Sequence, residues 1–338
     1  MNKKTKAEDP EADAAAVLGS TITAAFPGMN EDLRQTLASM GATLAVNNPA
    51  AGQEPTAQDA VALPAKILQF PLPFGDDTRA VSNALARGSL FAAVKERQFF
   101  KAYEIVGQVD GVKIEYKGEQ LNQDDHDTFL QLIAMANHKA FGLDICQPVN
   151  PVLRGIGRTT HQEQRRQLFD QMSRLVSGTI RLTTPNFRYE GHLLDDASTP
   201  HDQAMLPQFR RHLAYRLNPK FARLYAQSAY TLFDLQERHK LAGRGSELAK
   251  WLHLEIIGHA QHYALKVDTI RQRSGSTTKD LKKFRQILRQ ALDLLKGAEI
   301  ITAWQIDKDS DLVTIERTPS PSQQKHLTKK ATRKGRSL

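Results

Sequence analysis

The sequence predicts an α+β fold in which one arrangement of elements occurs twice: a short helix, a turn, a longer amphipathic helix and a β-hairpin. Apolar residues recur at three- and four-residue spacing within residues 160–178 and again within 277–297. Each of these segments follows a glycine-containing turn and precedes two β-prone runs. The chain has 338 residues, 40% of them hydrophobic, which is enough to fill two modest cores.

The later of the two long helices is expected over residues 277–297. Its apolar residues fall on one stripe, which predicts that they face a core; they are Leu281, Phe284, Leu288, Ala291, Leu292 and Leu295. Thr277 with Asp280 three residues on is typical of a helix N-terminus, and Gly297 is typical of a left-handed helix end. Local signals therefore predict both ends of this helix.

The segments around that helix predict a winged helix-turn-helix. Two β-prone runs, EIITAWQI and DLVTIER, enclose residues 307–310, which is typical of a β-hairpin. Before the helix, we expect a short strand at 263–266, a short helix at 267–273 with Val267 and Ile270 inward, and a turn at 274–276. In such a motif the second helix enters the major groove of DNA, and its N-terminal residues lie nearest the bases.

The water-facing side of the helix at 277–297 carries cationic and amide side chains, which suit phosphate as a partner. Those on this side or flanking it are Lys279, Lys282, Lys283, Arg285, Gln286 and Arg289. The residues expected nearest the bases are Thr278, Lys279, Lys282 and Gln286. An ordinary amphipathic surface helix has the same pattern, so this motif alone leaves both interpretations open.

The earlier helix, expected over residues 160–178, repeats these signals. Thr160 and Glu163 resemble a helix N-terminus, and Gly178 ends the helix after an inward stripe of Leu168, Met172 and Leu175. Strand-like runs at 179–184 and 187–194 flank Pro185-Asn186, and a strand at 141–145, a short segment at 150–154 and a turn at 155–157 come before the helix. Gln162 and Arg166 are expected to face outward and Arg165 to lie at the border of the core.

Charge indicates a polyanionic partner. The formal net charge is +9, and the excess of cations gathers in residues 271–296 and in the tail QQKHLTKKATRKGRSL, which contains no acid. Net charge alone does not separate DNA from RNA or an anionic membrane, but this clustering is typical of nucleic-acid binding. One cysteine, no signal-peptide pattern and no apolar run long enough for a bilayer predict a cytoplasmic protein.

Composition changes along the chain predict four parts. Residues 1–75 are expected to form a disordered, mobile arm, 76–200 a first winged-helix domain, 208–317 a second, DNA-binding winged-helix domain, and 318–338 a basic disordered tail. Within the domains we expect a strand pair at 112–121 and helices at 122–138 and 246–259. Asn218 followed by Pro219 predicts the start of a helical stretch that reaches His239.

Several of these segments, in this order, resemble the TrfA-type replication initiators of broad-host-range plasmids. The resemblance covers roughly residues 77–317. It is carried by DDTRAVSNALARGSLF from Asp76, by VKIEYKGEQLNQDD from Val112, and by LKVDTIRQRSGSTTKDLKKFRQIL followed by AWQIDKDSDLV. The segment QPVNPVLRGIGRTTHQ departs most from the family pattern, so the contacts of the first domain are the least defined.

The resemblance implies two winged-helix domains that bind direct repeats, called iterons, at a plasmid origin. It further implies opening of the adjacent duplex, recruitment of the host initiator, replicative helicase and sliding clamp, and a monomer–dimer equilibrium in which the dimer is an inactive store that limits copy number. Family binding roles carry over onto Lys279, Lys282, Lys283 and Arg285, and in the first domain onto Arg158, Arg165 and Arg166.

The segment QFPLPF, residues 69–74, has the spacing of peptides that dock on bacterial sliding clamps, with Gln69, Leu72 and Phe74 as the docking residues. An extended, proline-stiffened peptide can place an apolar anchor pair in a preformed groove at low ordering cost. The alternative is a linker whose apolar residues pack on the first domain.

Catalytic functions fit the sequence less well. A rolling-circle nicking initiator would use Tyr263 as nucleophile and nearby histidines as metal ligands, but His259-Ala-Gln-His262 lacks the two-histidine spacing of those enzymes. No phosphate-binding Gly-Lys-Ser/Thr loop occurs. We therefore expect a protein that is not an enzyme and needs no cofactor or metal. A transcription regulator with the same winged helices remains an alternative.

Overall fold

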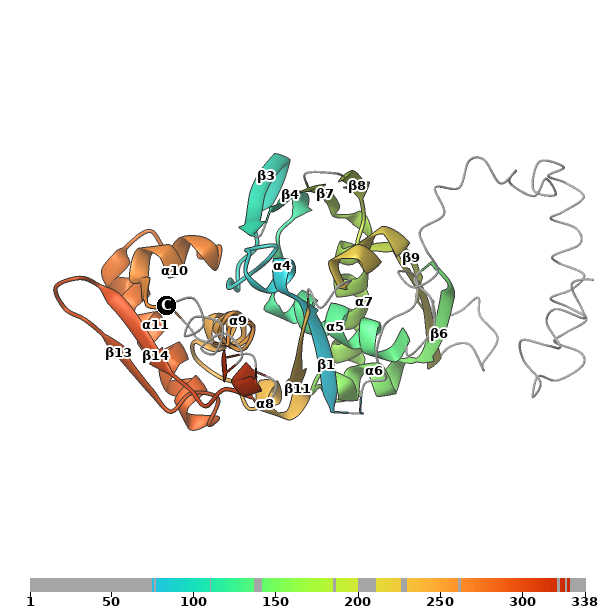
Figure 1. Cartoon of the computed structure of the whole chain (residues 1–338). Coiled ribbons are helices and arrows are strands. Elements are labelled where there is room, and N and C mark those ends of the chain that lie inside the picture. The colour runs from blue at the N-terminus through green and yellow to red at the C-terminus, as the bar shows by residue number, and fades with distance from the viewer. Residues whose placement is uncertain are drawn as a thin grey trace, which may run out of the picture. The chain divides into compact units, whose positions relative to one another are not determined.

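The computed structural model describes residues 75, 77–109, 111–136, 142–184, 187–199, 211–225, 230–260, 263–320, 323–325 and 327–328. Within these residues the chain has a mixed α+β fold, as the sequence predicts (Figure 1). The predicted arm, apart from Gly75, lies outside the described residues, and with it the predicted clamp peptide. Most of the predicted basic tail lies outside them as well.

The first hydrophobic core surrounds helix α5 (Gln123–Ala136). Phe129, Leu132 and Ile133 of α5 are at most 1% exposed, as the helical spacing predicts. Helices α6 (Val149–Gly155) and α7 (Gln162–Ser177) pack beside α5 and contribute to the same core. The predicted inward stripe of α7, Leu168, Met172 and Leu175, is confirmed because all three side chains are buried.

A four-stranded antiparallel sheet, in the order β3-β4-β7-β8, adds its inner face to the first core. Its strands are β3 (Phe99–Val109), β4 (Val112–Glu119), β7 (Thr179–Thr184) and β8 (Phe187–Gly191). Alternate residues of β4 and β7, such as Ile114, Tyr116 and Ile180, are buried, as expected for strands with one covered face. The expectation of a strand pair within 112–121 is wrong, because most of this segment forms the single strand β4 between β3 and β7.

Further strands complete the first core. Strands β6 (Asp144–Pro148), β10 (His212–Leu217) and β9 (Leu194–Ser198) form a sheet in that order, and β2 (Phe91–Ala92) pairs in parallel with β5 (Leu121–Asn122). Leu213, Tyr215 and Phe221 are buried in the same core although they follow the predicted first domain. This core therefore includes residues up to Tyr225, and the division at 200–208 stays a prediction.

The expected single helical stretch over 218–239 is wrong. The chain forms a 3-10 helix, η3 (Pro219–Tyr225), then strand β11 (Tyr230–Asp234) and the short helix α8 (Leu235–His239). Strand β11 pairs antiparallel with β1 (Thr78–Ser82), and this tertiary pairing overrides the local helical pattern. Asn218 nevertheless caps η3, since its Oδ1 accepts a hydrogen bond from the backbone N–H of Lys220 at 2.9 Å.

The second hydrophobic core brings together helices α9 (Ser246–Ile257), α10 (Val267–Arg273) and α11 (Leu281–Gly297). A three-stranded sheet completes it, in the order β12 (Leu265–Lys266), β14 (Leu312–Glu316), β13 (Ala303–Ile306). The predicted helix at 267–273 is confirmed, and Val267 and Ile270 are fully buried. A small third cluster links α4 (Asn83–Ala86), α5 and α9 through Ala86, Leu130 and Leu254.

The long helices begin at different residues from those predicted. Asp280, not Thr277, caps α11, because its Oδ1 accepts a hydrogen bond from the Lys282 backbone N–H at 2.8 Å. His161, not Thr160, is the N-cap of α7, with no side-chain cap bond. The expected left-handed residue at Gly297 is also wrong, since Gly297 is the last helical residue of α11 and Glu299 has the positive φ of 63°.

Candidate nucleic-acid interface

The C-terminal half of the described chain combines two helices, a tight turn and a hairpin in one unit. Helix α10 leads through a turn at Ser274–Ser276 toward α11, and Gly275 in this turn has a φ of 66°, which favours glycine. Figure 1 shows the β13–β14 hairpin beside α11. Strand β12, just before α10, pairs with β14, so the hairpin is hydrogen-bonded to the segment that opens the unit.

Helix α11 separates its apolar and cationic residues cleanly. Phe284, Leu288, Ala291, Leu292 and Leu295 are fully buried, as the sequence predicts. The side chains of Lys279, Lys282, Lys283, Gln286 and Arg289 are exposed. Within the described residues, none of these four cations forms an ion pair, so their charge is available to an external anion.

Of the predicted DNA-binding residues of this unit, Arg285 has its side chain engaged inside the protein, and Thr278 is held through its backbone. Arg285 donates two hydrogen bonds of 2.8 Å to the carboxylate of Asp311, at the start of β14, and the bond from Arg285 holds the pKa of Asp311 below its ordinary value. Thr278 donates its backbone N–H to Ser276 Oγ at 3.3 Å, and its carbonyl accepts a bond from Arg271. Arg285 therefore joins the helix to the hairpin, and backbone bonds hold Thr278 in place after the turn.

The hairpin turn is held by its own side chains. Asp307 Oδ1 accepts hydrogen bonds from the Ser310 hydroxyl at 2.6 Å and from the Ser310 backbone N–H at 2.7 Å, and these bonds lower the pKa of Asp307. Asp311 follows with a φ of 57°. The predicted hairpin around residues 307–310 is thus confirmed, and the exposed Lys308 lies in its turn.

The corresponding residues of the N-terminal half differ in exposure. Gln162 and Arg166 are exposed, and Arg166 forms an ion pair of 2.9 Å with Glu163 one turn earlier on α7. Arg165 donates to Asn150 Oδ1 at 2.9 Å, and Arg158 pairs with Asp124 at 3.2 Å with only 15% of its side chain exposed. Of the predicted residues in this half, Gln162 and Arg166 are therefore the most accessible.

The hairpin of the N-terminal half is attached differently from that of the C-terminal half. Strands β7 and β8 follow α7 and pair with each other, but their sheet partners are β3 and β4. The strand expected at 141–145 occurs at 144–148 as β6, and it pairs with β10 instead of the hairpin. The two halves share an order of elements and differ in their strand pairing.

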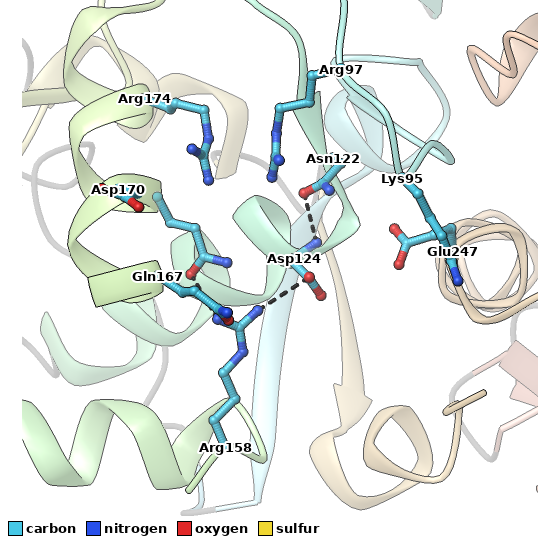
Figure 2. A pocket seen from close by; sticks show the side chains of 10 residues that line it. Lys95, Arg97, Asn122, Asp124, Arg158, Gln167, Asp170, Arg174 and Glu247 are labelled. Atoms are coloured by element: carbon cyan, nitrogen blue, oxygen red, sulfur yellow. Dashed lines mark hydrogen bonds and ion pairs between the residues drawn. The ribbon is translucent and has the colours of Figure 1, made fainter. Parts of the chain in front are cut away.

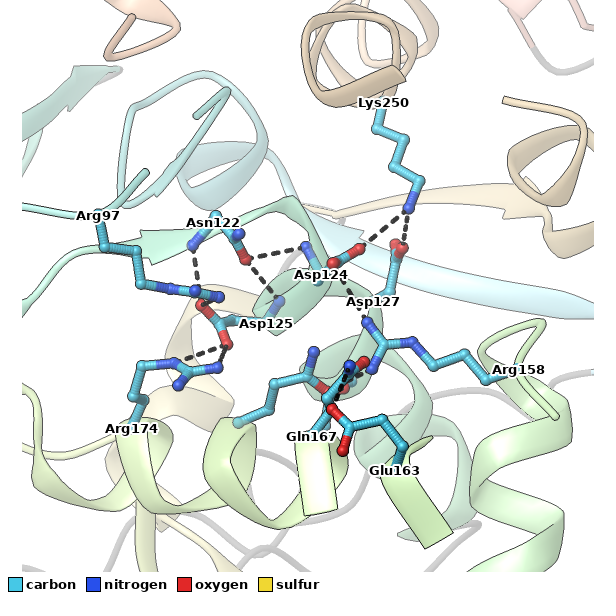
Figure 3. Close-up of polar contacts among 12 residues, drawn as sticks. Arg97, Asn122, Asp124, Asp125, Asp127, Arg158, Glu163, Gln167, Arg174 and Lys250 are labelled. Carbon is cyan, nitrogen blue, oxygen red and sulfur yellow. Dashed lines mark hydrogen bonds and ion pairs between the residues drawn. The ribbon is translucent and has the colours of Figure 1, made fainter. Parts of the chain in front are cut away.

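A cluster of charged residues at the start of α5 was not predicted from the sequence (Figure 3). Asn122 Oδ1 accepts hydrogen bonds from the backbone N–H groups of Asp124 and Asp125, and Asp125 bonds back to the Asn122 N–H, forming a reciprocal helix cap. The fully buried Asp125 also accepts two bonds from Arg174, of 2.9 and 3.0 Å, and one from Arg97. The Asn-x-x-Asp spacing is the one sequence signal that marks this site.

A second set of buried charges connects α5 to the C-terminal half. Asp127 accepts hydrogen bonds from Arg238 of α8 and from Lys250 of α9. Figure 3 shows the Lys250 bond, of 2.7 Å. Burial alone would raise the pKa of Asp127, but the two cations beside it hold this pKa well below its ordinary value. Lys250 also lies 3.4 Å from Asp124. The two halves are thus joined by ion pairs as well as by apolar contacts.

The structure describes two residues of the catalytic alternative, Tyr263 and His259. Tyr263 is 66% exposed and stacks edge-on against His259, with ring centres 6.2 Å apart, while His262 lies outside the described residues. In the described residues, no group of three or more His, Cys, Asp or Glu side chains is placed to hold a metal ion. Among the described helices, none has both the length and the apolar character of a bilayer span.

The chain is similar to a curated protein and to a solved structure. A curated relative, the plasmid replication initiator protein TrfA of Escherichia coli, is 25% identical over 252 residues, which are 72% of this chain and 63% of the relative. The match thus spans less than two thirds of that protein. A crystal structure of domains 2 and 3 of RctB has a TM-score of 0.50 at 13% identity, over 70% of this chain and 99% of the other, which shows a shared fold.

The family model described as TrfA protein matches residues 65–317, well over half of the chain. The chain therefore belongs to the TrfA protein family.

Proposed function

We propose that this protein is a plasmid replication initiator that binds direct repeats at an origin through two winged helix-turn-helix units. The observation that carries the proposal is the arrangement of residues on α11. One face of this helix is a fully buried apolar stripe, and the opposite face carries exposed cations that form no ion pair within the described residues. Long cationic side chains on a rigid helix that ends a helix-turn-helix are suited to a DNA groove. The curated relative is itself named a plasmid replication initiator.

Within this proposal the exposed residues have separable roles. Lys282 and Gln286 lie one helical turn apart near the start of α11, where they are suited to reach base edges. Lys283 and Arg289 are suited to phosphates, which supply affinity without sequence preference. In the N-terminal half, Gln162 and Arg166 of α7 have the equivalent position at the start of a long helix.

Arg285 has a different proposed role from the one that its position on α11 suggests. Since both of its hydrogen bonds go to Asp311, we assign it to fixing the hairpin against the helix. The hairpin, with Lys308 in its turn, would then follow the DNA backbone next to the groove that α11 enters.

Further steps of initiation belong to the same proposal. Binding of several repeats would bend and open the adjacent duplex by binding energy alone, without an enzymatic step, and host initiator, helicase and sliding clamp would join afterwards. A monomer would occupy one repeat, with a dimer as the stored form. Residues 69–74 would contact the clamp, and their deletion with a clamp pull-down tests this part: undiminished capture would remove it.

The test of DNA binding uses fluorescence anisotropy with origin repeats and with a scrambled duplex of equal length. Each phosphate that a variant no longer neutralises reduces the slope of log affinity against log salt by about 0.9. We expect Lys283→Ala to weaken both duplexes equally and to flatten this slope, and Lys282→Ala to change the preference among repeat variants. Lys296→Ala, at the exposed far end of α11, is the matched control. If the unchanged protein ignores repeats in dilute salt, the proposal fails.

A transcription regulator is the second candidate, because the same helices would serve it. A replication assay separates the two: a plasmid that carries the repeats but no other initiator gene should replicate only when this protein is supplied. Tyr263→Phe should replicate such a plasmid normally. Loss of replication with intact DNA binding in this variant would instead favour a nicking mechanism.

A further inference from the structure

The turn of the C-terminal unit is in direct contact with the N-terminal half. The backbone N–H of Ala93 donates to the carbonyl of Ser274 at 2.8 Å. A Cβ added at Gly275 would lie 2.7 Å from Ser89 Cβ and 3.0 Å from Ala92 Cβ. This contact leaves no room for a larger residue, so the segment after Ala92 is held at a fixed place beside the turn that precedes α11.

That segment carries a cation into the vicinity of α11. Lys95 is exposed, whereas Val94 beside it is buried and anchors the backbone. Lys95 lines a cavity of about 240 Å³ together with Arg244, Thr277 and Thr278. The cavity therefore combines a cation of the N-terminal half with a cation and hydroxyls of the C-terminal half.

A neighbouring cavity of about 410 Å³ shares Lys95 and Glu247 with the first and extends to Arg158, in the turn before α7 (Figure 2). Its other cations are occupied by acids: Arg158 pairs with Asp124, and Arg97 and Arg174 pair with Asp125. Acids of the protein itself thus neutralise these arginines of the larger cavity. By contrast, no ion pair engages Lys95 or Arg244 among the described residues, and both side chains are exposed.

Glu247 is the acid that lines the smaller cavity. Burial, followed by the nearby charge of Asp124, raises its pKa to about 7. Its Oε2 is buried and accepts no hydrogen bond. The protonated form of Glu247 carries no charge, so Glu247 offsets the charges of Lys95 and Arg244 less than a fully ionised carboxylate would.

We propose that Lys95 and Arg244 form a phosphate-binding site for the DNA backbone beside the groove that α11 enters. The proposal rests on the proposed DNA-binding function and adds a specific contact to it. Thr278, two residues before the Asp280 cap of α11, lines the same cavity, so a phosphate held there would lie beside the N-terminus of the proposed DNA-reading helix. Because Lys95 belongs to the N-terminal half, binding by the C-terminal unit would depend on a residue outside that unit.

The test uses the full chain with duplex repeats and compares Lys95→Ala, Arg244→Ala and the control Lys296→Ala. All three remove one exposed cation, so they change the net charge equally. For Lys95→Ala and Arg244→Ala we expect weaker binding and a salt slope that is shallower by up to about 0.9 for each phosphate left without its cation. We expect Lys296→Ala to match the unchanged protein.

A second experiment replaces single phosphates of the duplex by uncharged methylphosphonates. At one phosphate, this replacement should weaken DNA binding by the unchanged protein but not by Lys95→Ala, because that variant already lacks the cation that would bind this phosphate. If the unchanged protein binds repeats while Lys95→Ala and Arg244→Ala behave like the control, this site is refuted and the proposed function stands. The site would also be refuted if Lys95→Ala loses DNA affinity but no single methylphosphonate reproduces that loss. Lys95 would then act only through the overall electrostatic attraction between protein and DNA. Failure of the unchanged protein to bind would refute the proposed function instead.

Discussion

Replacement of Gly275 by alanine should destabilise the protein by about 2–5 kcal/mol. Alanine at a left-handed φ, here 66°, costs about 1–2 kcal/mol. The new Cβ would lie 2.7 Å from Ser89 Cβ and 3.0 Å from Ala92 Cβ, and relief of such overlap in a packed site costs about a further 1–3 kcal/mol. Neither neighbour can swing away, because both atoms are attached directly to the backbone.

The matched control for this substitution is Gly243→Ala. Gly243 has a φ of 96°, at least as unfavourable to alanine, but a Cβ there would meet nothing within 4 Å. It therefore isolates the backbone part of the cost. A double variant, Gly275→Ala with Ser89→Gly, removes the nearer of the two clashing atoms and should recover on the order of 1 kcal/mol beyond additivity.

Urea unfolding followed by tryptophan fluorescence measures these differences. Trp251 and Trp304 both contact the second core, which includes the helices on either side of the turn. If Gly275→Ala loses no more stability than Gly243→Ala, or if Ser89→Gly brings no recovery, the turn does not press on the N-terminal half.

Three further predictions concern stability. Glu299→Gly should stabilise the protein by about 1 kcal/mol in urea unfolding, because Glu299 has a φ of 63°; a loss would show that its side chain makes an important contact. The raised pKa of Glu247, about 7, means that the folded state binds a proton more tightly than the unfolded chain, so stability should fall as pH rises from about 4.5 to 7. Glu247→Gln should abolish that fall, and an unchanged pH profile would contradict the assignment. Asp127→Asn should cost about 3–5 kcal/mol at pH 7, because Arg238 and Lys250 lose a buried partner; at pH values low enough to protonate Asp127 the difference should vanish, and a constant difference would argue against the ion pairs.

Sequence patterns predicted the elements whose signals are local. The stripe from Phe284 to Leu295 and the short helix at 267–273 were found because helical spacing alone reveals a buried face. The start of α11 was misplaced since Thr277 and Asp280 are both good capping residues three positions apart, and only the backbone decides which one caps. Strand β11 was missed because its partner, β1, is distant in the sequence.

The candidate site was predicted only in part for a related reason. Sequence shows that Arg158 and Arg285 are cations near the expected DNA-reading helices, but not that folding brings Asp124 and Asp311 to them. The charged cluster around Asp125 and Asp127 assembles from helices far apart in the chain and has no periodic signal. The sequence does not mark Lys95 as a binding residue, because nothing near it in the chain links it to residues 274–278.

Hydrogen bonds from Ala93 to Ser274 and from Trp251 to the carbonyl of Gly88 join the two halves of the protein. They therefore set the angle between α7 and α11, the two helices proposed to read DNA. If both helices contact one repeat, as proposed, altered spacing inside that repeat should weaken binding. One inserted base pair between the two contacted blocks would turn one block by about 35° around the duplex axis, since a full turn takes about 10–10.5 base pairs. Under the proposed function, direct repeats bound by this protein should therefore vary in base identity at single positions far more freely than in length.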